Sequence, residues 1–143
     1  MVFRVIICCI LCLSFLSCQN KDKGAQANKD YVMYEPSEMA LLMEEMYKVN
    51  ERIKQDILDG KTPEKFPEEF LNIHTAELSD FKKRNVTFES FSRLYIDKQQ
   101  ELFDSSTNQE ARERFNQAIN LCISCHQTEC TGPIPRIKKL LIK

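Results

Sequence analysis

The sequence predicts an all-α protein that folds as an antiparallel four-helix bundle. Three observations support this fold class. Four segments place apolar residues at helical spacing, the 143 residues include only three glycines, and the apolar/polar alternation typical of β-strands is scarce. The glycines are also too scattered for a phosphate-binding loop or a dinucleotide fingerprint. We therefore expect a single small domain of helices and exclude an α/β nucleotide enzyme.

The first helix is expected to begin after Ser37, a suitable N-cap, and to end near Gly60. This span corresponds to about six turns. Charged residues such as Glu45 and Lys48 occupy its outer face. Its inner face is apolar and consists of Met39, Leu42, Met43, Met46, Val49, Ile53 and Ile57.

The next two helices are predicted from shorter patterns. The second is expected to extend from Pro67 to about Leu78, with an inner side of Phe70, Leu71, His74 and Leu78. The third is expected to begin at Thr87 and to continue to Phe103, with Val86 and Phe91 in the positions of a hydrophobic staple.

The fourth helix is expected to follow the capping-box sequence Thr107-Asn-Gln-Glu110. Its inner stripe ends in two cysteines and consists of Phe115, Ala118, Ile119, Cys122 and Cys125. Because short connections join the four helices, we expect neighbouring helices to be antiparallel. The first and fourth helices should then run in opposite directions.

A candidate export signal precedes the predicted helices. Residues 2–17 contain one Arg followed by an apolar run that ends in a small residue, the layout of a secretory signal peptide, and the run is too short for a stable membrane span. Phe15-Leu16-Ser17-Cys18 resembles a bacterial lipobox, although Phe15 replaces the usual Leu. The resemblance implies a signal peptide over residues 1–17 and a diacylglycerol on Cys18. A signal peptide cut elsewhere and a retained hydrophobic anchor are the alternatives.

The predicted domain organisation follows from this signal. Residues 18–33 would form the lipidated cysteine and a polar, flexible tether, because residues 19–29 lack branched and aromatic side chains. The helical domain would then span residues 34–143. We expect an exported bacterial lipoprotein in the periplasm, with the inner or outer membrane left open. The balance of 20 basic and 21 acidic residues argues against a nucleic-acid partner.

The pattern most informative about chemistry is Cys122-Ile-Ser-Cys125-His126, the Cys-x-x-Cys-His sequence of c-type haem attachment. On a helix, residues at i and i+3 share a face, so both thiols can reach the two vinyl groups on one edge of a porphyrin. His126 would then be the proximal iron ligand. The expected cofactor is one covalently attached haem c.

Three other interpretations of these cysteines remain. A thioredoxin-like redox pair normally opens a helix after a strand, whereas this pair falls late on a helix. Cys122, Cys125, His126 and Cys130 could together bind zinc. An exported chain could also form a disulfide and keep spare thiols. The haem interpretation accounts in addition for the histidine directly after the second cysteine.

With this motif on its last predicted helix, the sequence is similar to the class II c-type cytochromes, the cytochrome c prime family of four-helix bundles. The resemblance covers about residues 36–126. Class I cytochromes supply a methionine from downstream of their motif, whereas all five methionines precede this one. One departure from the family is the longer tail from Cys130 onward. Its Arg136, Lys138 and Lys139 could pair with haem propionates or form a solvated tail.

The resemblance implies that the first helix supplies the residue opposite His126. A methionine there would give a six-coordinate electron carrier, and an apolar residue would leave the iron open to small gases. Met39, Met43 and Met46 share one helix face, and we favour Met46, then Met43, as the distal ligand. A methionine stripe is also typical of a core. His74 is a further candidate ligand or a packing residue.

These observations predict a membrane-anchored monohaem electron carrier that is not an enzyme and that serves redox partner proteins of a respiratory chain. The first alternative is a five-coordinate cytochrome c prime that binds nitric oxide or carbon monoxide. The second is a structural zinc or disulfide lipoprotein without haem. Cys130 would be a small buried side chain or a free thiol, and an intermolecular disulfide through it would give a dimer.

Overall fold

A computed structural model describes residues 35–63, 65–104 and 110–143, which belong to one compact unit, residues 35–143. The described part of the chain contains helices and no strand, and this confirms the all-α prediction. The signal peptide, Cys18 and the tether lie outside the described residues, as does Thr107 of the expected capping box. The elements in chain order are α2 (Glu38–Leu58), the 3-10 helix η1 (Glu68–His74), α3 (Val86–Glu101), α4 (Ala111–Glu129), α5 (Ile134–Ile137) and the 3-10 helix η2 (Lys138–Leu140).

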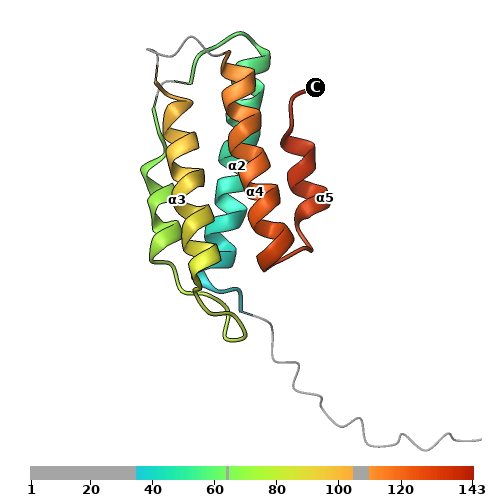
Figure 1. Cartoon of the computed structure of the whole chain (residues 1–143). Helices are drawn as coiled ribbons and strands as arrows, with labels where there is room; N and C mark the ends of the chain where they lie inside the picture. Colours follow the sequence, from blue (N-terminus) through green and yellow to red (C-terminus); the bar gives the residue numbers. More distant parts are fainter. Residues whose placement is uncertain (1–34, 64, 105–109) are drawn as a thin grey trace, which may run out of the picture. The chain divides into compact units, whose positions relative to one another are not determined.

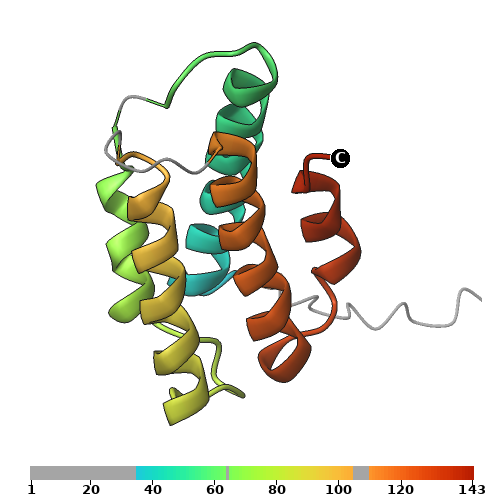
Figure 2. The same cartoon turned by 45° about the horizontal axis from the view of Figure 1, so that its top comes forward.

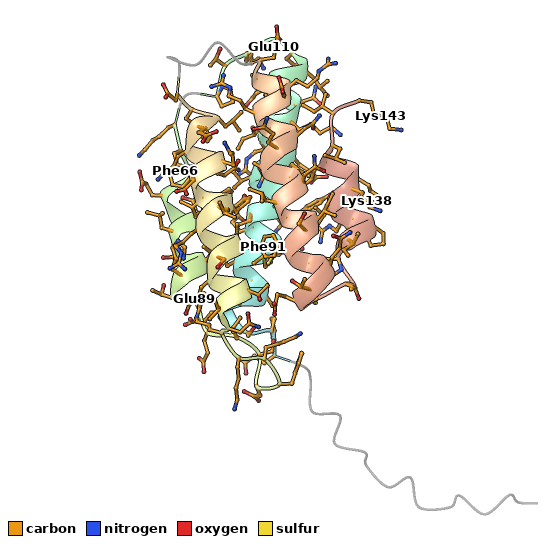
Figure 3. All side chains as sticks on the ribbon, in the orientation of Figure 1. Phe66, Glu89, Phe91, Glu110, Lys138 and Lys143 are labelled. Atoms are coloured by element: carbon orange, nitrogen blue, oxygen red, sulfur yellow. The ribbon has the colours of Figure 1, made fainter. Side chains whose placement is uncertain are left out.

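From α2 to α5, successive elements of this unit run in alternating directions, and η2 continues α5 (Figure 1). Among the helix pairs, α3 and α4 have the most extensive contact, and η1 packs against both α2 and α3. Figure 2 shows α5 beside α4, on the side away from α3. Figure 3 labels Glu89 near the start of α3 and Glu110 next to the start of α4, at opposite ends of the unit. The N-terminus of α2 and the C-terminus of α4 therefore lie at the same end of the unit.

The helix α2 begins and ends as predicted. The Ser37 Oγ accepts a hydrogen bond from the Ala40 N–H at 3.3 Å, as expected for an N-cap. The helix stops at Leu58, and Gly60 follows with a φ of +73°, a left-handed conformation that favours glycine. The predicted inner face is turned to the core, with Val49 and Ile53 buried.

The second predicted helix is shorter than expected and is a 3-10 helix, η1. With three residues per turn, Phe70 and Ile73 fall on one side, and both are buried. Leu71 and His74, which the α-helical spacing placed on the inner side, are exposed. The prediction of their burial was wrong because the period of the segment is three residues rather than 3.6.

The start of α3 also differs from the prediction. Asn85 is the N-cap, and its Oδ1 accepts a hydrogen bond from the Phe88 N–H at 2.7 Å. Val86 is 77% exposed, so it forms no hydrophobic staple with Phe91. The helix ends at Glu101, and the chain leaves it through a 3-10-type turn. The last long helix, α4, begins at Ala111 without a side-chain cap and carries the cysteine motif in its final turns.

Within the mostly apolar core, a buried polar network joins α2 and α3. The Asn50 Nδ2 donates to the Tyr95 hydroxyl at 3.1 Å and to the Met46 carbonyl at 2.8 Å. The Gln99 Nε2 donates to the Asn50 Oδ1 at 2.7 Å. Because these side chains are almost fully buried, the bonds constrain how α2 and α3 pack. Within the described ranges, no helix has the length and hydropathy to span a membrane.

Candidate functional site

The cysteine motif and the methionine stripe line the same cavity. This cavity has a volume of about 350 Å³, within the range of about 300–1,000 Å³ that is usual for small-molecule sites. Its walls come from the first half of α2, the loop between η1 and α3, part of α3, the end of α4 and the C-terminal segment, which we define as residues 131–143. Most of the lining is apolar. The predicted site residues in it are Met39, Met43, Met46, Cys122, Cys125, His126, Cys130 and Arg136.

The antiparallel arrangement of α2 and α4 explains why the methionine stripe and the cysteine motif line the same cavity. The methionines lie in the first turns of α2, and the motif lies in the last turns of α4. Residues at i, i+3 and i+4 share a helix face, so Cys122, Cys125 and His126 all reach the cavity. Residues that are about 80 positions apart in sequence thus line one site.

The imidazole of His126 is held by a hydrogen bond just beyond α4. Its Nδ1 lies 2.8 Å from the backbone carbonyl oxygen of Cys130, the C-cap residue of the helix. Because a carbonyl oxygen only accepts hydrogen bonds, Nδ1 is the donor, and in the neutral imidazole Nε2 then keeps its lone pair. Metal-ligating histidines are commonly oriented in this way. His126 is therefore prepared to bind a metal through Nε2.

The two motif thiols are half-buried, and they remain protonated at neutral pH. The pKa of Cys122 is raised from 9.0 to about 12, mainly by burial and also by the nearby Cys125. Burial is also the main cause that raises the pKa of Cys125 to about 11, with a contribution from the charge of Glu129. Reactive redox cysteines have lowered pKa values instead. All three cysteines of the described residues are free of disulfides.

The three methionines of α2 differ in burial. Met39 and Met46 are 6% and 5% exposed, whereas Met43 is half-buried. The backbone of Met46 is also fixed, because its carbonyl accepts the hydrogen bond from Asn50. The preferred distal candidate is thus a buried residue at a well-defined position in the cavity wall.

Other candidates lie away from the cavity. His74 is exposed, does not line the cavity, and has its Nδ1 3.4 Å from the Ser92 Oγ. Lys138 and Lys139 also lie outside the cavity lining. The structure therefore does not bring these three residues to the motif.

The geometry does not assemble a zinc site from the motif. In the part of the chain that the structure describes, no group of three or more His, Cys, Asp or Glu side chains is arranged to hold a metal ion. Cys122, Cys125, His126 and Cys130 are thus not brought together as four ligands. The histidine and the two half-buried thiols instead line a cavity that is large enough for an organic group.

A cluster at the cavity wall was missed in the sequence. The Arg136 guanidinium forms two bonds to the Glu44 carboxylate, one of them from Nη2 to Oε1 at 3.0 Å, and lies 3.8 Å from the centroid of the Tyr47 ring. The hydrogen bond from Arg136 lowers the pKa of the Glu44 carboxyl. The sequence pattern identifies Arg136 as a basic residue but does not indicate its partners, Glu44 and Tyr47. No local pattern links α5 to residues about 90 positions earlier.

Comparisons with known proteins add no relative, because the chain matches no protein-family profile, no curated protein and no solved structure. The expected resemblance to the class II c-type cytochromes rests on the Cys-x-x-Cys-His motif and the helical pattern of the sequence alone.

Proposed function

We propose that this protein is a membrane-anchored monohaem c-type cytochrome that carries electrons, with its cofactor attached to the last helix of an antiparallel four-helix bundle. In this proposal, η1 takes the place of one bundle helix. The observation that carries the proposal is the shared cavity, in which Cys122, Cys125 and His126 face the methionine stripe of α2. The motif, the free Nε2 of His126 and the apolar lining all fit a haem.

The residues of the cavity have distinct proposed roles. Cys122 and Cys125 would each add their S–H across one vinyl group, which forms two thioether bonds and releases nothing. The Cys130 carbonyl would hold the imidazole of His126 while Nε2 binds the iron. Met46, or Met43 as the second choice, would offer its thioether sulfur from the opposite wall. A bound haem c would supply an iron that accepts and releases one electron.

The location and partners follow from the N-terminal sequence. We propose that residues 1–17 direct export, that Cys18 carries lipid and that the helical domain lies in the bacterial periplasm. The partners would be redox proteins of a respiratory chain and the membrane that holds the lipid. In this role the protein carries electrons and is not an enzyme.

Covalent haem attachment provides the direct test. The full chain, coexpressed with haem maturation factors, should be coloured, give a positive pyridine haemochrome assay and gain the mass of one haem. The double variant Cys122→Ser/Cys125→Ser should lose covalent haem, whereas the matched control Cys130→Ser should keep it. A colourless wild-type protein would contradict the proposal and favour the lipoprotein without haem.

One observation favours a second function at the same site. Besides the methionines, the cavity is lined by apolar side chains such as Leu78 and Phe88. If no methionine binds the iron, such a lining leaves space for a small gas, as in a five-coordinate cytochrome c prime. Binding of carbon monoxide or nitric oxide by the reduced wild-type protein would support this function over electron transfer.

A further inference from the structure

The two most exposed large apolar side chains of the described residues lie close together in sequence. Phe81 is 78% exposed in the loop of residues 75–85, and Val86, which follows this loop, is 77% exposed. Contact of such side chains with water is unfavourable, and a pair at one end of a domain indicates a surface that another apolar phase covers.

This loop lies at the end of the unit where the described chain begins. The Ser37 Oγ is 3.2 Å from the Ser79 Oγ, and the Glu77 N–H donates to the Glu38 carboxylate at 2.9 Å. The Met39 N–H in turn donates to the Glu77 carbonyl at 2.9 Å. In Figures 1 and 3 the loop extends past the start of α2. The loop is thus fixed to the residues through which the N-terminal chain enters the domain.

The segment between Cys18 and the start of the described chain is short enough to keep the loop near a membrane. Cys18 precedes Glu35 by 17 residues, and a chain of this length spans at most about 60 Å. We propose that the segment from Ser79 to Val86 docks on the lipid bilayer that holds the anchor, with Phe81 and Val86 inserted into the interface. This inference rests on the proposed lipidation of Cys18.

The charges of the loop indicate what kind of contact this is. Lys82 donates to the Glu129 carbonyl, and Arg84 donates to the carbonyls of Ile73 and Ala76 at 3.0 and 2.6 Å. The acidic residues Glu77 and Asp80 offset two of the three positive charges of Lys82, Lys83 and Arg84. Apolar insertion, aided by the high effective concentration that an anchor provides, should therefore dominate over attraction to anionic lipids.

Docking would also affect the proposed function, because Phe81 and Lys82 contribute to the cavity lining. Insertion of Phe81 would hold this side of the cavity close to the bilayer. Redox partners embedded in the same membrane would then reach the cavity more readily than partners that diffuse freely.

A single tryptophan can test the contact, because the chain contains none. The lipidated, haem-loaded Phe81→Trp variant is reconstituted in phosphatidylcholine vesicles with or without brominated acyl chains. Bromine should lower the indole fluorescence about twofold if the side chain is inserted, and the decrease should persist in high salt. Taking the ratio of the two vesicle types cancels any constant quenching by haem.

The matched control is Leu58→Trp. Leu58 is 50% exposed at the opposite end of α2, about 30 Å from the start of that helix, and its fluorescence should not respond to bromine. Equal quenching in both variants, or none in Phe81→Trp, would overturn the proposal. A blue-shifted but bromine-insensitive indole in Phe81→Trp would also overturn it, because protein or cofactor would then cover the site.

Mass spectrometry and the haem spectrum of the same sample separate this inference from the proposed function. A chain with lipid and haem but without quenching in Phe81→Trp would refute docking alone. A chain without diacylglycerol would refute the anchor and the docking together. Quenching in a lipidated chain without haem would support docking and contradict the cytochrome.

Discussion

At the scale of single residues, the bond between His126 and the Cys130 carbonyl shows what the motif alone leaves open. The Cys-x-x-Cys-His pattern predicts a histidine beside two thiols. The carbonyl, which comes from the first residue after α4, accepts a hydrogen bond from Nδ1 and leaves Nε2 available in the neutral imidazole. The spacing thus determines which residues can meet a cofactor, and the helix end determines how the imidazole is held.

The methionines of α2 give the first prediction at this scale. In haem-loaded protein, Met46→Ala should convert a six-coordinate low-spin iron to a five-coordinate high-spin iron that binds carbon monoxide, because the buried thioether is lost. Met43→Ala should leave the coordination unchanged. Absorption spectra of reduced protein with and without carbon monoxide measure this difference. An unchanged spectrum in Met46→Ala together with conversion in Met43→Ala would assign the ligand to Met43.

The thiols of Cys122 and Cys125 give a prediction about pH. In the haem-free chain, alkylation by iodoacetamide requires the thiolate, and burial raises the pKa of these thiols to about 12 and about 11. Both should react slowly at pH 8 and faster as the pH approaches 11, whereas the same cysteines in denaturant should react near pH 9. Peptide mass spectrometry measures the extent at each pH. Equal rates in the native and denatured chains would contradict the burial of the motif.

The same shifts predict how stability depends on pH. A thiol whose pKa is raised by folding stays protonated in the native state after the unfolded chain has released its proton. Its contribution to stability is therefore complete below pH 9 and decreases as the pH rises toward 12. In the haem-free chain, this decrease in stability at high pH should be smaller in Cys122→Ser than in the wild type.

At the scale of elements, the tail that distinguishes this sequence is an ordered wall of the domain. The Lys54 ammonium donates to the Lys139 carbonyl at 2.7 Å, and the amide side chain of Asn116 pairs with both backbone groups of Ile142 at 2.8 and 2.9 Å. Ile137 and Leu140 are buried against the core. These contacts hold the C-terminal segment against α2 and α4 and thereby complete the cavity.

A substitution series can measure how strongly this segment is held. Leu140→Ala should lower the free energy of unfolding by about 2–5 kcal/mol, because it leaves a cavity in the core. Arg136→Ala should cost less, since its ion pair with Glu44 is solvent-exposed, and Lys138→Ala should be nearly neutral. Denaturant unfolding measures all three. A neutral Leu140→Ala would indicate that the C-terminal segment does not pack as described.

Acid should weaken the ion pair between Arg136 and Glu44, which helps to hold the C-terminal segment against α2. Arg136 lowers the pKa of the Glu44 carboxyl below its ordinary value of 4.5, so the ion pair contributes at neutral pH and is lost as the pH falls below that value. The difference in stability between the wild type and Arg136→Ala should therefore decrease in acid.

At the scale of the whole molecule, the cavity predicts that the cofactor completes the core. Buried side chains such as Met46, Tyr95 and Leu140 line it. The haem-loaded protein should therefore unfold at a higher temperature than the haem-free chain, because a group held only by the native state stabilises that state. Circular dichroism during heating measures both forms. Equal melting temperatures would contradict a haem bound inside this cavity.

The sequence by itself determined the features that depend on neighbours along the chain. Helical spacing and a capping Ser37 defined α2, and the i, i+3, i+4 spacing of the motif placed its three residues on one face. Local rules reached their limit at η1 and at the Asn85 cap. The structure instead has a period of three residues in η1, and its N-cap for α3 is Asn85, two positions before the Thr87 that the predicted staple requires.

Only the tertiary structure decided which distant residues meet. It paired Arg136 with Glu44 across 92 residues, brought the methionines of α2 to the same cavity as the motif, and left His74 outside. It also placed exposed Phe81 beside the start of α2. The backbone geometry of a single helix determines which of its residues share a face. The contacts between distant residues depend instead on how separate helices pack, and no short-range pattern in this sequence predicts that packing.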